Sequence, residues 1–126
     1  MNWMLVAAGG ALGSLARYAL ARGVPGVPGE WPLATMAANL LGSFVIGFAA
    51  VLIAARGAGH EEALRLFFMT GVLGGFTTYS AFALETVTLA GEGAWPRAFA
   101  YLIATVVGCA LLAQAGRVVG SLLTEI

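Results

Sequence analysis

Polar side chains recur at helical spacing inside stretches of this sequence that are otherwise apolar. Three rows have this spacing: Gly10, Ser14 and Arg17; Thr35, Asn39 and Ser43; and Tyr101, Thr105 and Cys109. Residues three or four apart lie on one face of a helix, so each row forms a stripe of polar positions. A polar stripe facing lipid is costly. The rows therefore either hold neighbouring helices together by hydrogen bonds or line a polar path.

The segment 71–85 carries the densest set of candidate groups, with the sequence GVLGGFTTYSAFALE. Its paired glycines followed by two threonines weaken a helix, so we expect a break there whose freed carbonyls can bind a cation. Beyond the break, Tyr79 and Phe82 are three residues apart and share a helical face. This aromatic pair either packs against other side chains or lines a pore. Glu85 follows one turn later and is the most deeply placed acid.

The composition indicates that these groups lie in a membrane. The chain has 126 residues, of which 60% are hydrophobic and 10% charged, and its mean hydropathy is +0.93. Soluble domains carry about 25% charged residues, so a soluble enzyme is nearly excluded. Six arginines balance six glutamates, and this zero net charge provides no field that would attract nucleic acid.

The charges divide the chain into four apolar stretches, which cover residues 1–16, 31–55, 66–84 and 98–116. A membrane-spanning helix needs about 20 mostly apolar residues. We therefore expect a single four-helix transmembrane domain over residues 1–126, with spans near 3–21, 33–55, 64–90 and 96–122. A Gly- and Pro-rich loop at 23–29 separates the first two spans. The short loops leave no room for a nucleotide-binding or extramembrane catalytic domain. We therefore expect that the protein is not an enzyme.

The arginines give no clear orientation, because three fall on each side of the expected membrane. Either Arg17 is buried and a weak but real bias of the arginines towards one side remains, or copies insert both ways and form an antiparallel dimer. Glycines four residues apart recur in three spans and favour close helix packing, in a compact bundle that dimerisation would extend. These pairs are Gly9–Gly13, Gly71–Gly75 and Gly116–Gly120.

Three segments resemble the signature segments of the Fluc-type (CrcB) fluoride channels. They are GGALGSLARY at 9–18, NLLGSF at 39–44 and GGFTTYSAF at 74–82, in the expected order and on the expected spans. The resemblance covers essentially the whole chain. It implies an all-α, dual-topology antiparallel homodimer in the plasma (inner) membrane of a prokaryote, with the third helix broken mid-membrane. It also implies two pores that passively export cytoplasmic fluoride and confer fluoride resistance.

The resemblance also implies roles for individual residues. The fluoride pathway would include Asn39, Tyr79, Ser80, Phe82 and Tyr101. The hydroxyl of Thr105, in the same row as Tyr101, is a further donor that we expect on this pathway. A structural Na⁺ at the dimer interface would be bound by the backbone carbonyls of Gly74 and Thr77. Arg17 would lie at a vestibule. Glu85 would neighbour this polar track, and because an acid is unfavourable beside an anion path, we expect it either to be protonated or to accept hydrogen bonds from neighbouring hydroxyl groups.

These implied roles agree with the chemistry of an anion pathway. Amide and hydroxyl groups can donate hydrogen bonds to fluoride, and the edge of an aromatic ring is positive. Several weak contacts suit conduction better than one buried cation. No nucleotide is expected to drive transport, because a chain without lysine cannot carry a Walker A motif.

Two positions depart from the family pattern and leave the detailed ion path open. Tyr79 stands where Phe is common, and Ala81 replaces a residue that often carries a hydroxyl. The main rival function is a small multidrug-resistance-type, proton-coupled exporter, which needs a Glu in its first span, whereas the first acid here is Glu30. A non-transporting subunit of a membrane assembly would leave the polar rows without a purpose.

Overall fold

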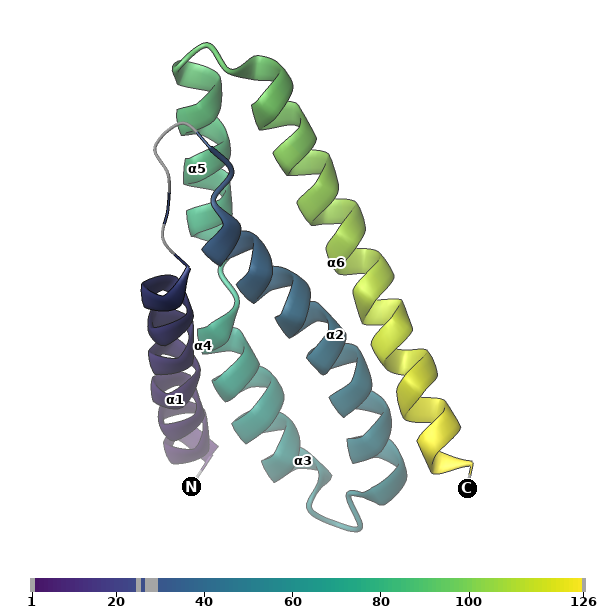
Figure 1. Cartoon of the computed structure of the whole chain (residues 1–126). Helices are drawn as coiled ribbons and strands as arrows, with labels where there is room; N and C mark the ends of the chain where they lie inside the picture. Colours follow the sequence, from purple (N-terminus) through teal and green to yellow (C-terminus); the bar gives the residue numbers. More distant parts are fainter. Residues whose placement is uncertain (1, 25, 27–29, 126) are drawn as a thin grey trace.

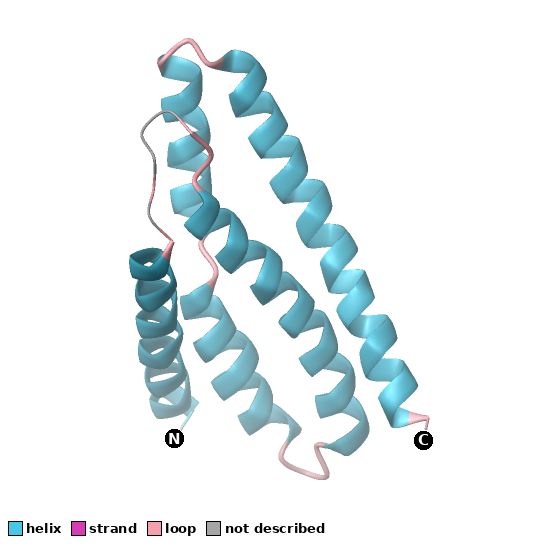
Figure 2. Ribbon diagram, viewed as in Figure 1, coloured by secondary structure: helices cyan, strands magenta, loops and turns pink. Residues whose placement is uncertain are grey.

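The computed structural model describes residues 2–24, 26 and 30–125, and helices are the only regular elements in this part of the chain (Figure 2). The Gly- and Pro-rich loop expected at 23–29 lies mostly outside the described residues. The helices are α1 (Asn2–Gly23), α2 (Leu33–Arg56), α3 (Glu61–Leu64), η1 (Arg65–Leu73), α4 (Gly74–Phe76), α5 (Tyr79–Gly91) and α6 (Trp95–Thr124). The segments from α3 to α5 follow one another along a single bent span.

Four spans in the described chain are long and apolar enough to cross a membrane, as predicted. They contain 22, 24, 31 and 30 residues, and each overlaps one of the expected ranges. In Figure 1, α1 lies beside the first half of the third span, and α6 runs along α2. The N- and C-terminal ends lie at the same end of the bundle, as an even number of spans requires.

Glycines form the contact between α1 and the third span. A Cβ atom on Gly13 would collide with the Val72 carbonyl, and one on Gly71 would lie 2.9 Å from the Cα of Gly9. A Cβ on Gly75 would lie 2.5 Å from the Gly10 carbonyl oxygen. Two of the predicted glycine pairs therefore meet each other. Because glycine has no side chain, the two backbones touch and gain dispersion contacts. In a membrane such contacts hold helices together, since lipid tails are as apolar as the helices and provide no hydrophobic driving force.

The contact between α2 and α6 is also built on glycine. A Cβ on Gly47 would collide with the Ala113 carbonyl, and one on Gly116 would collide with the Phe44 carbonyl. Gly120 continues this contact, since its Cβ would lie 3.2 Å from the Phe48 carbonyl oxygen. These close contacts hold α2 and α6 together along their length.

One feature of the third span was not expected. Residues Arg65–Leu73 form a nine-residue π-helix rather than an α-helix. Such wide turns are rare and usually single, so they need support from neighbouring packing. Here the support comes from α1, because Gly9 faces the Phe67 carbonyl and Gly71 inside the π-helix. Hydrophobic periodicity does not signal this local widening.

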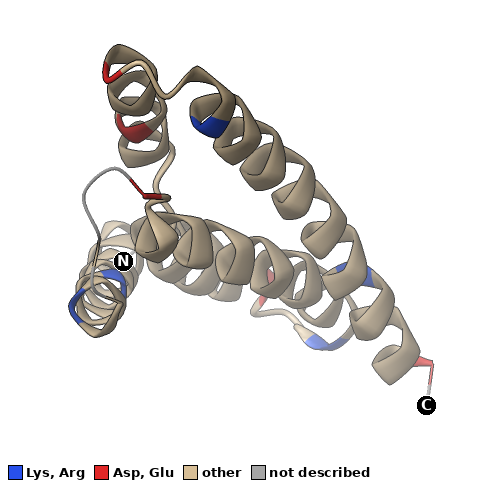
Figure 3. Cartoon of the chain, turned by 45° about the horizontal axis from the view of Figure 1, so that its top comes forward, with Lys and Arg blue, Asp and Glu red and all other residues tan. Residues whose placement is uncertain are grey.

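Charged residues gather near the ends of the bundle, and the middle of the helices is largely free of them (Figure 3). The exception is Glu85, which lies within α5 and is only half-buried. The distribution fits a bilayer, because a charged group in the hydrocarbon region must face protein or water.

Candidate functional site

The predicted break in the third span lies at Thr77 and Thr78. Both have extended backbone, with φ/ψ of −83°/158° and −152°/109°. The Thr77 hydroxyl donates to the Leu73 carbonyl at 2.9 Å, at the end of the first half. The Thr78 hydroxyl accepts from the Ala81 amide at 3.3 Å and caps the start of α5. The threonine pair therefore satisfies backbone groups on both sides of the break.

Asn39 on α2 fixes the break by a pair of hydrogen bonds. Its Nδ2 donates to the Thr78 carbonyl at 3.1 Å, and its Oδ1 accepts from the Thr78 amide at 2.8 Å. The backbone amide can only donate, so it determines which end of the carboxamide faces it. One of the two Nδ2 hydrogens remains for another acceptor. Asn39 is 8% exposed and lines a cavity beside the break, which is the main cavity of the site.

Arg17 on α1 contacts α4, the short helix that ends at the break. Its Nε donates to the Gly75 carbonyl oxygen at 3.1 Å, and the side chain is half-buried. Among the described residues, the Gly74 and Thr77 carbonyls receive no hydrogen bond from another element. This contact between Arg17 and α4 was not apparent from the sequence. The vestibule role implied for this arginine stays a prediction.

A cavity of about 360 Å³ lies beside the break. Ten residues line it: Asn39, Gly42, Ser43, Ile46, Thr77, Tyr79, Phe82, Thr105, Val106 and Cys109. Two of the polar rows thus converge on one space, from α2 and α6. Thr105 is 3% exposed, and its hydroxyl has no hydrogen-bond partner among the described residues. Buried hydroxyls are normally paired, so this one is a candidate hydrogen-bond donor to a ligand.

Three aromatic rings continue from the cavity towards the end of α5. The Phe82 ring is 5% exposed and lies between Tyr79, at 5.6 Å between centroids, and Tyr101, at 5.4 Å. The Tyr79 and Phe82 rings meet edge to face. Tyr79 is 78% exposed in the single chain, although it stands next to the break.

Glu85 accepts hydrogen bonds from two helices. The Thr35 hydroxyl donates to its Oε1 at 2.7 Å, and the Tyr101 hydroxyl donates to its Oε2 at 2.9 Å. This arrangement is the one expected if Glu85 accepts from neighbouring hydroxyls. Thr35 was not among the predicted site residues, but its place four residues before Asn39 in a polar row was the signal that could have identified it.

The predicted site residues do not all border the cavity. Asn39, Thr77, Tyr79, Phe82 and Thr105 line it. Glu85 and Tyr101 lie further along, joined by their hydrogen bond. Ser80 is exposed on α5, with its hydroxyl 3.4 Å from that of Thr78. Gly74 lies in α4, before the break, and Arg17 contacts that helix at Gly75.

Comparison with known proteins identifies the family of the chain. Residues 4–117 match the family model described as CrcB-like protein, Camphor Resistance (CrcB). A protein of Opitutus terrae named fluoride-specific ion channel FluC is 43% identical over 118 residues, covering 92% of this chain and 89% of the relative. A protein of the same name from Magnetococcus marinus is 42% identical, covering 94% of this chain and 96% of its own length. Another from Roseobacter denitrificans is 56% identical, covering 71% of this chain and 71% of its own length. The chain is therefore a member of the CrcB-like family.

Proposed function

We propose that this chain forms a fluoride-specific, passive ion channel that exports cytoplasmic fluoride and confers fluoride resistance. The names of its relatives support this function over nearly the whole chain. The four spans leave only short connections for any other activity. Membership of the CrcB-like family does not support the alternative of a proton-coupled exporter.

The observation that carries the proposal is the cavity beside the break. No cation lines it, and two of its lining residues carry unused donors: Thr105, whose hydroxyl has no partner among the described residues, and Asn39, which keeps one Nδ2 hydrogen. Phe82 and Tyr79 add ring edges, which attract anions weakly. Fluoride is strongly hydrated, so a pore must replace its water contacts without binding it too tightly. A set of neutral donors and ring edges meets both requirements.

We propose further that the channel is an antiparallel homodimer of dual topology, with two pores built from both subunits. Irregular backbone at membrane depth must be covered by protein or water. In the single chain the break is flanked by the exposed Tyr79 and Ser80, so a partner surface is needed there. The even division of the arginines supports insertion of copies in both orientations.

The break also has the donor set for a structural Na⁺ at the dimer interface. The carbonyls of Gly74 and Thr77 receive no hydrogen bond from another described element, and carbonyl oxygens suit a hard cation. One subunit supplies few ligands, so a site shared by two subunits would be more complete. The ion would neutralise the oxygens of the break and hold the two copies together.

Fluoride efflux from liposomes tests the proposed function. The purified protein should release fluoride rapidly, driven by the fluoride gradient alone, with little chloride movement, as measured with ion-selective electrodes. Equal chloride flux or a strict requirement for a proton gradient would contradict the proposal. In cells, a tag at the C-terminus should be found on both sides of the plasma (inner) membrane. A single orientation would contradict dual topology.

A further inference from the structure

We propose that Arg97 and Glu30 form the charged mouth of the fluoride pathway and set its conductance in opposite directions. The two side chains line a second cavity of about 320 Å³, together with Trp31 and Leu33. This inference rests on the proposed channel function. It assigns a role to two charges that lie outside the helix break and its cavity.

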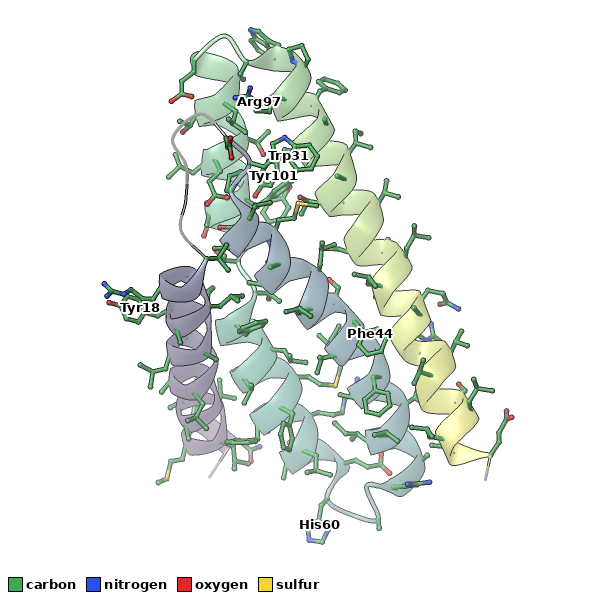
Figure 4. All side chains as sticks on the ribbon, viewed as in Figure 1. Tyr18, Trp31, Phe44, His60, Arg97 and Tyr101 are labelled. Carbon is green, nitrogen blue, oxygen red and sulfur yellow. The ribbon has the colours of Figure 1, made fainter. Side chains whose placement is uncertain are left out.

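Trp31 connects this second cavity to the candidate pathway. Its ring centroid lies 6.3 Å from that of Tyr101, whose hydroxyl donates to Glu85. The Tyr101 ring in turn packs against Phe82, which lines the main cavity. Figure 4 shows Arg97, Trp31 and Tyr101 near one another at one end of the bundle. The second cavity and the main cavity share no lining residue, and the packed rings of Trp31, Tyr101 and Phe82 lie in series between them.

The starts of two helices place these residues at the mouth. Trp31 precedes α2, and its carbonyl accepts from the Leu33 amide at 2.8 Å, which turns the chain into the helix. Arg97 lies in the first turn of α6, whose start carries a proline. The amino-terminal ends of helices carry partial positive charge, so both helix starts reinforce the attraction of Arg97 for anions.

The two charges should act on fluoride in opposite senses. Arg97 is exposed, so it raises the local fluoride concentration without holding the ion in a dry site. Glu30 is also exposed and lowers that concentration. Because both act through water, salt should screen their effects. In the proposed antiparallel dimer, each side of the membrane would carry one such mouth.

Charge-neutralising variants at two ionic strengths test this inference. At about 10 mM salt, Arg97→Gln should slow fluoride efflux from liposomes about threefold, and Glu30→Gln should accelerate it by a similar factor. At about 1 M salt both variants should match the wild type. Arg97→Lys should retain the wild-type rate. Arg65→Gln, an exposed change outside both cavities, is the matched control and should have little effect.

The outcomes separate the mouth from the channel function. If the wild type conducts fluoride and both Arg97→Gln and Glu30→Gln conduct at the wild-type rate, the proposed role of the mouth is overturned and the channel function is not. An equal loss in Arg97→Gln at low and high salt would also overturn it, because that pattern indicates a structural role. Wild-type protein that releases no fluoride would overturn both proposals. Size-exclusion profiles matching the wild type show that the variants keep their assembly.

Discussion

Replacing Thr105 with valine separates a pathway residue from a packing residue. The substitution exchanges a hydroxyl for a methyl group of similar size on a side chain that is 3% exposed. The hydroxyl has no partner among the described residues. Leaving a buried hydroxyl unpaired costs about 1–3 kcal/mol. Thr105→Val should therefore raise the free energy of unfolding by about 1 kcal/mol, or leave it unchanged.

The same substitution should slow conduction. A hydrogen bond to a charged group contributes about 1.5–3 kcal/mol. Each ~1.4 kcal/mol added to a barrier slows a step tenfold. If Thr105 donates to fluoride at the highest barrier of the pathway, loss of this hydrogen bond should therefore reduce efflux about 10- to 150-fold. Thr105→Ser keeps the donor and should conduct far better than the valine variant. The free energy of unfolding should thus rise or stay the same, while the rate of fluoride efflux falls.

Fluoride efflux from liposomes and chemical unfolding in detergent measure the two effects. Thr88→Val is the matched control, because the Thr88 hydroxyl is exposed on α5 and donates to the Leu84 carbonyl at 2.9 Å. That variant should leave efflux unchanged. Wild-type efflux in Thr105→Val would refute the pathway role. A loss of stability in that variant would show that the hydroxyl is paired in the assembled channel.

Three further predictions follow from the packing and from the cavity. Phe82→Ile should reduce fluoride efflux strongly, because the ring edge is lost from the cavity, while size-exclusion chromatography still shows the dimer. The control is Phe99→Ile, a change at an exposed ring. Unchanged efflux in Phe82→Ile would mean that the ring does not line the pathway. Gly13→Ala should destabilise the protein by about 1–3 kcal/mol in unfolding experiments, since its Cβ would collide with the third span. Gly10→Ala meets no atom within 4 Å and should be neutral or slightly stabilising; equal effects of the two glycine changes would contradict this packing. A small thiol-reactive methanethiosulfonate should slow efflux by modifying Cys109, which lines the cavity, and Cys109→Ala should abolish that inhibition; inhibition that persists in the alanine variant would show that another group is responsible.

Much of the candidate site was predictable because helical spacing is a local property. The four-residue rows identified Asn39 and Thr105 before any contact was known, and the structure brings both rows to one cavity. The threonine pair after two glycines indicated the break for the same reason, since helix propensity and capping depend on neighbouring residues. The same spacing indicated Tyr101, and Glu85 was the most deeply placed acid, but the sequence did not show that the two are in direct contact.

The contacts between distant segments required the tertiary structure. The bond from Arg17 to Gly75 joins residues 58 positions apart, and the paired bonds between Asn39 and Thr78 span 39 positions. No periodicity encodes such pairings, because they depend on how the helices cross. The π-helix of Arg65–Leu73 belongs with them, since it accompanies the close contact with α1.

The sequence by itself therefore determined the membrane environment, the four spans and the place where the third span breaks, because hydropathy and helix propensity act over one segment at a time. Only the tertiary structure decided which polar groups are already paired and which remain free. Asn39 uses both ends of its carboxamide to hold the break, and Glu85 receives two hydroxyl donors. Thr105 keeps an unpartnered hydroxyl at the cavity. Hydrogen-bond satisfaction depends on groups from several helices, so it is fixed only when those helices pack.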